Sequence, residues 1–218
     1  MMEEAAQELR RGWTTGACAA AAARAAYTAL LGNECPDPVT ISLPGGQRPA
    51  FSLARHLVTK ESAEAAIVKD AGDDPDVTHG ALVVVRVRAL DEGEGVRFRA
   101  GEGVGTVTRE GLSLAVGEPA INPEPRRMIA AEIAEVAALY NAPGDVEVEI
   151  AILGGDRLAE RTLNGRLGIV GGLSVLGTTG VVIPFSCSAW IHSIHRSVDV
   201  ARAAGLSHVA ASTGSTSE

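Results

Sequence analysis

The stretch richest in reactive side chains covers residues 69–80 and reads KDAGDDPDVTHG. It places a lysine, several aspartates and a histidine between two apolar runs. A cation, carboxylates and an imidazole together can hold a polar substrate and exchange a proton with it. We expect Lys69 to receive an anionic group and the acidic and imidazole groups to order the site or carry a proton. These candidate catalytic residues are Asp70, Asp73, Asp74 and His79. A solvated turn is the alternative interpretation.

The second candidate is the glycine-rich segment 163–186, in which glycine recurs every few residues. Glycine weakens helices and strands, but it accepts positive φ values and lets backbone or ligand approach closely. Successive amides in such a segment can point one way and bind an anion or a polar ligand. The candidate binding residues here are Gly171, Gly172, Gly177, Thr178 and Thr179. A series of tight turns and β-bulges would explain the same pattern without a ligand.

Three further groups of polar residues stand at predicted helix positions. Thr14 and Thr15 precede an alanine-rich run, and hydroxyls with free amides at a helix start suit an anionic group. Two arginines at 126–127 occupy a predicted first turn, where the helix dipole disfavours cations, and this indicates an anionic partner. His192 and His195 have metal-compatible spacing, but no third ligand accompanies them, so we interpret them as a surface pair and predict no metal site.

Three helices must position these groups. The first is predicted over 17–31, capped by one of the two threonines. The second follows Asn122, whose side chain can cap it, and carries an apolar stripe at helical spacing. The third is opened by Ser186 or Ser188 and ends before Gly205.

Alternating apolar and polar residues predict the strands. In 81–90 and 96–100, valine and phenylalanine alternate with arginine, so we predict a hairpin whose arginines form a solvated face balanced by nearby acids. The other predicted strands are 39–43, 51–53, 146–150, 181–183 and a buried strand at 208–213.

The composition excludes several classes of protein. The formal net charge of −8 argues against nonspecific nucleic-acid binding, which needs a basic surface. No apolar run is long enough to span a bilayer, and the acidic N-terminus lacks the layout of a signal peptide. The three cysteines share no short spacing, so we expect free thiols in the cytoplasm and no zinc framework.

Five stretches of the chain, in this order, resemble the CbiD family of cobalt-precorrin-5B C1-methyltransferases. They are Trp13–Gly16, Lys69–Gly80, Gly101–Thr108, Gly117–Pro123, and Leu167–Gly172 continuing through Gly177–Gly180. Several long matches in one order are more specific than any single glycine pattern.

The resemblance implies an α+β domain with mixed strands, an alanine-rich helix and glycine-rich loops, joined in the family to a C-terminal Rossmann-like domain. The implied boundaries are 1–186 for a substrate-binding domain and 187–218 for the first helix and strand of the incomplete second domain. The implied reaction is methylation of C1 of cobalt-precorrin-5B, giving cobalt-precorrin-6A in anaerobic cobalamin (vitamin B12) biosynthesis. S-adenosylmethionine is the implied methyl donor, and cobalt enters only as part of the substrate.

The resemblance also suggests how residues divide between acceptor and donor. The acceptor is ringed by carboxylates, which lysine and arginine receive well. The expected receivers are Lys69, Arg126, Arg127 and Arg166, beside Thr14, Thr15 and the glycine-rich segment. The expected donor-binding residues are Thr213, Gly214, Ser215 and Glu218. Because family members continue past the position matching Glu218, we expect the chain alone to bind the donor poorly and to transfer no methyl group without a complementing partner.

Two alternative functions remain open from the sequence. One is a small-molecule kinase with a glycine-rich phosphate loop, although the Gly-Lys-Ser/Thr ending of a P-loop is missing. The other is a non-catalytic tetrapyrrole-binding module. The resemblance leaves room for other cobalamin-pathway enzymes as partners, and it implies neither a nucleic-acid nor a membrane partner.

Overall fold

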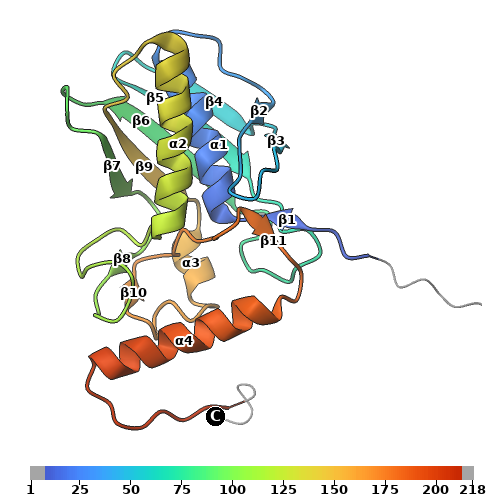
Figure 1. Ribbon diagram of the computed structural model, residues 1–218, viewed down its shortest axis with the longest axis vertical. Helices are drawn as coiled ribbons and strands as arrows, with labels where there is room; N and C mark the ends of the chain where they lie inside the picture. Colours follow the sequence, from blue (N-terminus) through green and yellow to red (C-terminus); the bar gives the residue numbers. More distant parts are fainter. Residues whose placement is uncertain (1–7, 213–218) are drawn as a thin grey trace, which may run out of the picture.

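A five-stranded mixed sheet forms the frame of the protein (Figure 1). The structure is a computed structural model, and it describes residues 8–212. The strand order is β4-β5-β6-β9-β7, antiparallel except for the parallel pair β9–β7. The strands of this sheet are β4 (Arg55–Val58), β5 (Ser62–Val68), β6 (Leu82–Ala89), β7 (Val96–Ala100) and β9 (Val146–Ile152). The protein is therefore α+β, as predicted.

The predicted hairpin between β6 and β7 is wrong. Both strands form, but β9 lies between them, antiparallel to β6 and parallel to β7. Charge explains the insertion, because β9 carries glutamates in register with arginines on both neighbours. Glu147 faces Arg88 and Arg97 across the ladders, and Glu149 faces Arg86 and Arg99. Opposite charges placed across a ladder favour pairing, whereas a β6–β7 hairpin would have set arginine against arginine.

Helix α1 (Thr15–Leu30) is the centre of the fold. It packs against β5 and β6 on one side and against α2 on the other, and every residue except Arg24 and Leu30 is buried. Its run of alanines explains this position, because only a slim helix allows close approach from all sides. The predicted threonine cap is confirmed: Thr14 Oγ1 accepts a hydrogen bond from the amide of Ala17 at 3.2 Å.

Helix α2 (Pro123–Tyr140) covers the outer side of α1. Ile129, Ile133 and Val136 form the predicted stripe and are at most 1% exposed, whereas Tyr140 at the helix end is 41% exposed. Asn122 occupies the N-cap position, but its side chain makes no capping hydrogen bond, so that part of the prediction is wrong. Prolines in the first turn already remove amides that a cap would satisfy.

Three two-stranded pairs complete the strands, and two of them join segments that are far apart in the sequence. β1 (Gly12–Trp13) pairs with β11 (Val181–Val182), and β8 (Thr106–Val107) with β10 (Ile169–Val170). β2 (Val39–Thr40) pairs with β3 (Ala50–Phe51), so both predicted strands form, but the one at 39–43 is shorter and the one at 51–53 is shorter and begins one residue earlier. A short helix, α3 (Gly155–Ala159), follows β9.

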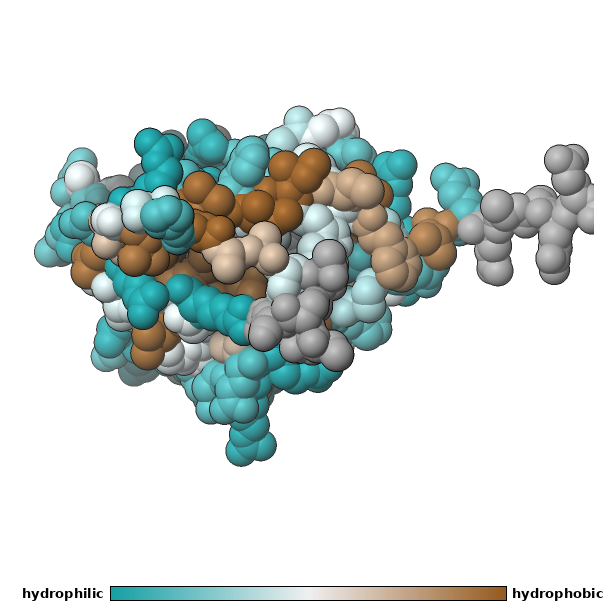
Figure 2. Space-filling model, turned by 90° about the horizontal axis from the view of Figure 1, so that it is seen from below, coloured by the Kyte–Doolittle hydropathy of each residue, from teal (hydrophilic) through white to brown (hydrophobic). Residues whose placement is uncertain are grey.

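Helix α4 (Cys187–Ala203) lies across the bottom of the molecule in Figure 1 and contrasts with α1. The predicted start is confirmed, because Ser186 is the N-cap and its hydroxyl accepts from the amide of Ala189. Only Val200 is buried. Seen from this end, apolar side chains gather on the surface (Figure 2), and those of α4 include Trp190, Ile191 and Ile194. No helix within residues 8–212 is long and apolar enough to cross a membrane.

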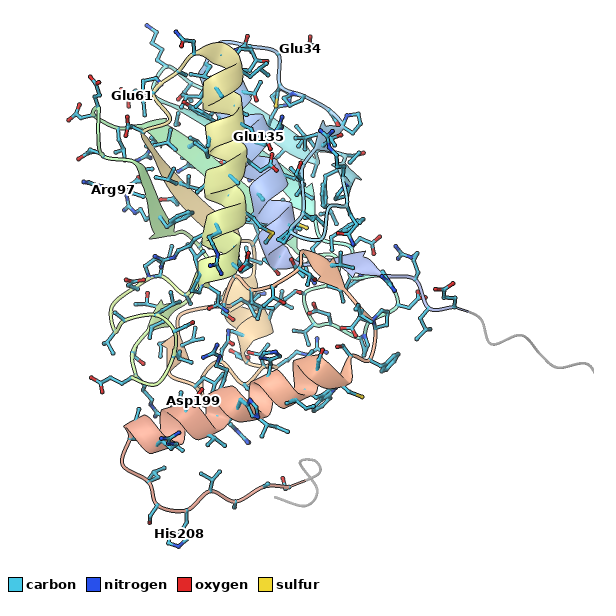
Figure 3. The ribbon with its side chains drawn as sticks, in the orientation of Figure 1. Glu34, Glu61, Arg97, Glu135, Asp199 and His208 are labelled. Atoms are coloured by element: carbon cyan, nitrogen blue, oxygen red, sulfur yellow. The ribbon has the colours of Figure 1, made fainter. Side chains whose placement is uncertain are left out.

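The buried strand predicted at 208–213 is wrong over its described part. Residues 208–212 are exposed and irregular, and Figure 3 shows His208 on the segment beyond α4, at the lower end of the view. A strand requires a partner for its ladder, and no strand of the described chain pairs with this segment. The Rossmann-like second domain and the boundary at 186–187 stay predictions.

Candidate functional site

The start of α1 is where the two candidate stretches meet. The amide of Trp13 donates to the carbonyl of Asp70 at 2.7 Å, and the amide of Thr14 donates to the carbonyl of Gly180 at 3.0 Å. The amide of Gly16 donates to the carbonyl of Leu176 at 3.1 Å. The polar loop 69–80 and the glycine-rich segment are thus both hydrogen-bonded to the start of the same helix.

A pocket of about 160 Å³ opens between these elements. It is lined by Thr14 and Thr15 from the start of α1, by three polar residues of the loop, and by the glycine-rich segment with the turn before it. The polar lining residues are Thr14, Thr15, Lys69, Asp76, Thr78, Thr162, Asn164 and Ser174. We call this the α1 pocket. Of the predicted binding residues, the structure brings Thr14, Thr15 and Lys69 together here.

An ion pair between a buried lysine and a half-buried aspartate forms the charged wall of the α1 pocket. The Lys69 side chain is 2% exposed, and its Nζ lies 2.5 Å from Oδ2 of Asp76. The other oxygen of Asp76 accepts hydrogen bonds from the amide of Thr78 at 2.8 Å and from its hydroxyl at 2.7 Å. Burial by itself would raise the pKa of Asp76, but Lys69 and the two Thr78 bonds outweigh it, so this pKa lies below its ordinary value. Asp76 is therefore held as an anion that fixes the ammonium.

Two buried side chains add hydrogen-bonding capacity to the pocket wall. Thr15 is 5% exposed, and its hydroxyl makes no hydrogen bond to any residue between 8 and 212. All fully enclosed side-chain nitrogen and oxygen atoms of the described chain have partners, so this hydroxyl is open to the pocket. Asn164, 8% exposed, donates from Nδ2 to the carbonyl of Gly172 at 3.2 Å. That bond holds its amide group at the pocket edge.

The three predicted catalytic aspartates have other roles in this structure. Asp70 makes a bidentate ion pair with Arg10, with nitrogen–oxygen distances of 2.5 and 2.9 Å. Asp73 accepts from the amide of Arg10 at 2.6 Å, and Asp74 accepts from the amide of Phe185 at 3.0 Å. They therefore tether segments 10–13 and 180–186 to the loop, and none of them lines the α1 pocket.

The electrostatics of Asp70 agree with a tether. The Arg10 guanidinium and the amide of Gly72 lower the pKa of Asp70 to about 2. A carboxylate with so low a pKa is a poor proton acceptor at neutral pH. His79 lies close by, with Nδ1 accepting from the amide of Ala71 at 3.1 Å, which assigns the hydrogen of the neutral ring to Nε2. Its side chain is 53% exposed.

The predicted arginines are not part of the α1 pocket. Arg126 donates to Glu118 at 2.7 Å and to the carbonyl of Ile121 at 2.8 Å, and Arg127 pairs with Glu124. Local acids thus satisfy these cations of the first helical turn. Arg166 is exposed, and its carbonyl accepts from Arg109 at 3.3 Å.

Glycine at two positions of the segment is required by backbone geometry, as predicted. Gly171 has φ +87° and open space beside its Cα, whereas Gly177 has φ +128° and touches the helix cap. A Cβ on Gly177 would lie 2.3 Å from Oγ1 of Thr14. Gly172 has no such φ, but a Cβ there would lie 2.3 Å from the carbonyl oxygen of Gly103. Thr178 and Thr179 are exposed and outside the α1 pocket.

A second depression, of about 350 Å³, lies beside Trp13 and Phe51. It is larger than the α1 pocket, but it is shallow and mostly apolar, and Asp70 is its one charged lining residue. The charged and hydroxyl groups capable of selective binding gather in the α1 pocket, which we therefore take as the candidate site.

The sequence reasoning missed the polar residues Asp76, Thr78, Thr162, Asn164 and Ser174. Asp76 could have been identified from the sequence, because it lies in the same polar loop as Lys69, seven positions after it and four positions before the glycine that ends the loop.

The predicted donor-binding residues Thr213, Gly214, Ser215 and Glu218 lie outside the described residues. Within the described chain, no group of three or more His, Cys, Asp or Glu side chains could hold a metal ion, and the two helical histidines are exposed.

Comparison with known proteins places the chain in a family. The CbiD family model matches residues 2–184. A cobalt-precorrin-5B C(1)-methyltransferase of Bradyrhizobium sp. strain BTAi1 is 64% identical over 96% of this chain and 56% of its own length. One from Agrobacterium fabrum is 64% identical over 100% of this chain and 57% of its own. The chain thus spans little more than half the length of these relatives.

A solved structure agrees with the sequence relatives. The crystal structure of a cobalamin biosynthesis protein (CbiD) from Archaeoglobus fulgidus superposes with a TM-score of 0.63 at 32% identity. The superposition covers 85% of this chain and 58% of that one. Because a family model, close relatives and a solved structure agree, the chain belongs to the CbiD family.

Proposed function

We propose that this chain is the acceptor-binding part of a cobalt-precorrin-5B C(1)-methyltransferase of cobalamin biosynthesis. Relatives at 64% identity carry that name and match nearly the whole chain. The observation that supports it most is the α1 pocket, where the family-like stretches at 13–16, 69–80 and 167–180 converge around a buried ammonium. Stretches far apart in sequence that meet at one polar pocket are typical of a binding site.

The proposed reaction moves one methyl group from S-adenosylmethionine to C1 of the macrocycle. An electron pair of the ring forms the new carbon–carbon bond, the sulfur–methyl bond breaks, and S-adenosylhomocysteine leaves. Holding the ring carbon in line with the sulfonium supplies most of the rate enhancement in such a transfer. In this proposal, the chain orients the acceptor. Its fixed Lys69 ammonium and its hydroxyls bind the polar substituents around the macrocycle. The donor remains assigned to Thr213, Gly214, Ser215 and Glu218.

The geometry does not support the kinase alternative. A P-loop joins a strand to the start of a helix, whereas the glycine-rich segment here leads into β11.

The three free cysteines, Cys18, Cys35 and Cys187, support a reducing compartment such as the cytoplasm.

The proposed function is tested with the full-length protein that contains this chain. Incubation with cobalt-precorrin-5B and methyl-labelled S-adenosylmethionine should place one label on the corrinoid and release S-adenosylhomocysteine. An absorbance titration with a cobalt corrinoid, with and without the donor, separates the two remaining functions. Saturable corrinoid binding with no methyl transfer by the full-length protein would identify a tetrapyrrole-binding module instead, and no binding at all would contradict both.

A further inference from the structure

We propose that the α1 pocket is a subsite for a single carboxylate, which takes one acetate or propionate arm of the tetrapyrrole and rejects a carboxamide arm. The identity of the whole ligand rests on the proposed function. The subsite itself rests on the size, the charge and the unused hydrogen-bond donors of the pocket.

The size of the pocket decides how much of a ligand it holds. Sites that enclose a whole small molecule occupy roughly 300–1,000 Å³. The α1 pocket, at about 160 Å³, is far below the volume that a macrocycle would need. It therefore receives a substituent, while the body of the ligand lies outside, against the loop and the glycine-rich segment that form its rim.

The unused donors of the pocket indicate the chemistry of that substituent. An ammonium carries three donor hydrogens. Lys69 Nζ donates to Asp76 and to no other acceptor of the described chain, although its side chain is 2% exposed. The hydroxyl and the amide of Thr15 likewise have no partner between residues 8 and 212, and Thr15 stands at the first position of α1. A carboxylate oxygen accepts from all of these donors.

Charge explains why a carboxylate is favoured over a carboxamide. The first turn of α1 adds the positive end of a helix dipole to the lysine, which offsets repulsion from Asp76. A neutral amide would gain less from this field, and its NH₂ group would face donors rather than acceptors. Asp76 acts as a positioning residue in this arrangement, because it orients the ammonium through Thr78-supported hydrogen bonds and does not itself meet the ligand.

The test uses the purified chain labelled with ¹⁵N and two isosteric probes, sodium propionate and propionamide. We expect propionate to shift the Thr15 amide and the Lys69 ammonium signals saturably, with a dissociation constant on the order of 10 mM for so small a ligand. Sodium chloride at the same concentrations controls for ionic strength. Equal responses to propionate and propionamide, or shifts with propionate no larger than with chloride, would overturn the subsite.

Two isosteric variants of one helix give the matched comparison. Thr15→Val removes the free hydroxyl, and we expect it to weaken propionate binding about tenfold. Thr28→Val is the control, because Thr28 is also buried in α1 but its hydroxyl donates to the carbonyl of Arg24 at 2.9 Å. Wild-type affinity in Thr15→Val would refute the assignment. If propionate binds as expected but the full-length protein does not methylate the corrinoid, the subsite stands and the proposed function fails.

Discussion

Two regions of this protein are rich in charge, and they differ in whether those charges satisfy one another. On the outer face of the sheet, the arginines of β6 and β7 are exposed and face the glutamates of β5 and β9. The pairs include Arg86–Glu64, Arg86–Glu149, Arg88–Glu147 and Arg99–Glu149. Arg97, labelled at the sheet edge in Figure 3, pairs with Glu94 at 2.9 Å. This face needs no ligand to complete it.

The α1 pocket has fewer charges, but its lysine is buried and incompletely hydrogen-bonded. The Lys69 ammonium has three donor hydrogens but only one acceptor within the described chain, and the Thr15 hydroxyl makes no hydrogen bond there. The number of charged residues therefore does not identify the binding site in this protein. What marks it is hydrogen-bonding capacity on largely buried side chains that the fold leaves unused.

The largest expected effect is that of Lys69→Met. Removing the ammonium leaves the carboxylate of Asp76 without its partner, which typically costs about 3–5 kcal/mol of unfolding free energy for a buried pair. Urea denaturation measures this loss. The double variant Lys69→Met/Asp76→Asn should recover most of the stability, since Asn still accepts from Thr78, but it should not recover propionate binding. Recovery of both would make the pair purely structural.

The next effect separates two glycines that share positive φ. Gly171→Val and Gly177→Val should each lose about 1–3 kcal/mol through backbone strain. At Gly177 the new side chain also collides with Thr14, which adds about 1 kcal/mol and disturbs the cap of α1. Thermal unfolding of both variants, together with the corrinoid titration, checks that Gly177→Val loses more stability than Gly171→Val. Equal losses would contradict the close packing of Gly177 on the helix cap.

A smaller effect concerns the Asp70 tether and depends on pH. Because the pKa of Asp70 falls from 3.8 to about 2 on folding, its ion pair with Arg10 contributes fully above about pH 4. The contribution is lost as the pH falls through about 2, so the β1 segment should loosen in that interval. Trp13 fluorescence in a Trp190→Phe background reports it, and Asp70→Asn should abolish this acid transition. An unchanged transition in Asp70→Asn would assign it to another carboxyl group.

The smallest effect is expected on the sheet face. Arg88→Gln should change the unfolding free energy by no more than about 0.5 kcal/mol, because its 3.9 Å contact with Glu147 is exposed and salt-screened. It should leave corrinoid binding unchanged. A loss of affinity in this variant would place the acceptor on the sheet face and reverse the comparison between the two regions.

The sequence predicted local elements well and long-range arrangement poorly. The alanine run, the Thr14 cap and the stripe of α2 follow from local spacing, and the structure confirms them. The β6–β7 hairpin failed because the partner of both strands lies about fifty residues downstream, at β9. The strand at 208–213 failed over its described part because apolar composition does not provide a pairing partner.

The candidate site was likewise predicted in part. Lys69, the two threonines and the glycine-rich segment were expected together around the acceptor, and the structure places all of them at the α1 pocket. The choice among the aspartates could not be made from composition, because Asp70 and Asp76 differ only in what the fold brings to them. Arg10, 60 positions away, reaches Asp70, whereas Lys69 turns inward to Asp76.

The most direct test of the α1 pocket as the acceptor site is an absorbance titration of the chain with a cobalt corrinoid that carries free carboxylates. Thr15→Val and Thr28→Val are compared with the unchanged chain under identical salt. We predict a corrinoid affinity about tenfold weaker in Thr15→Val and unchanged in Thr28→Val. Equal affinity in all three proteins would contradict it, because the unused donors of the pocket would then play no part in holding the acceptor.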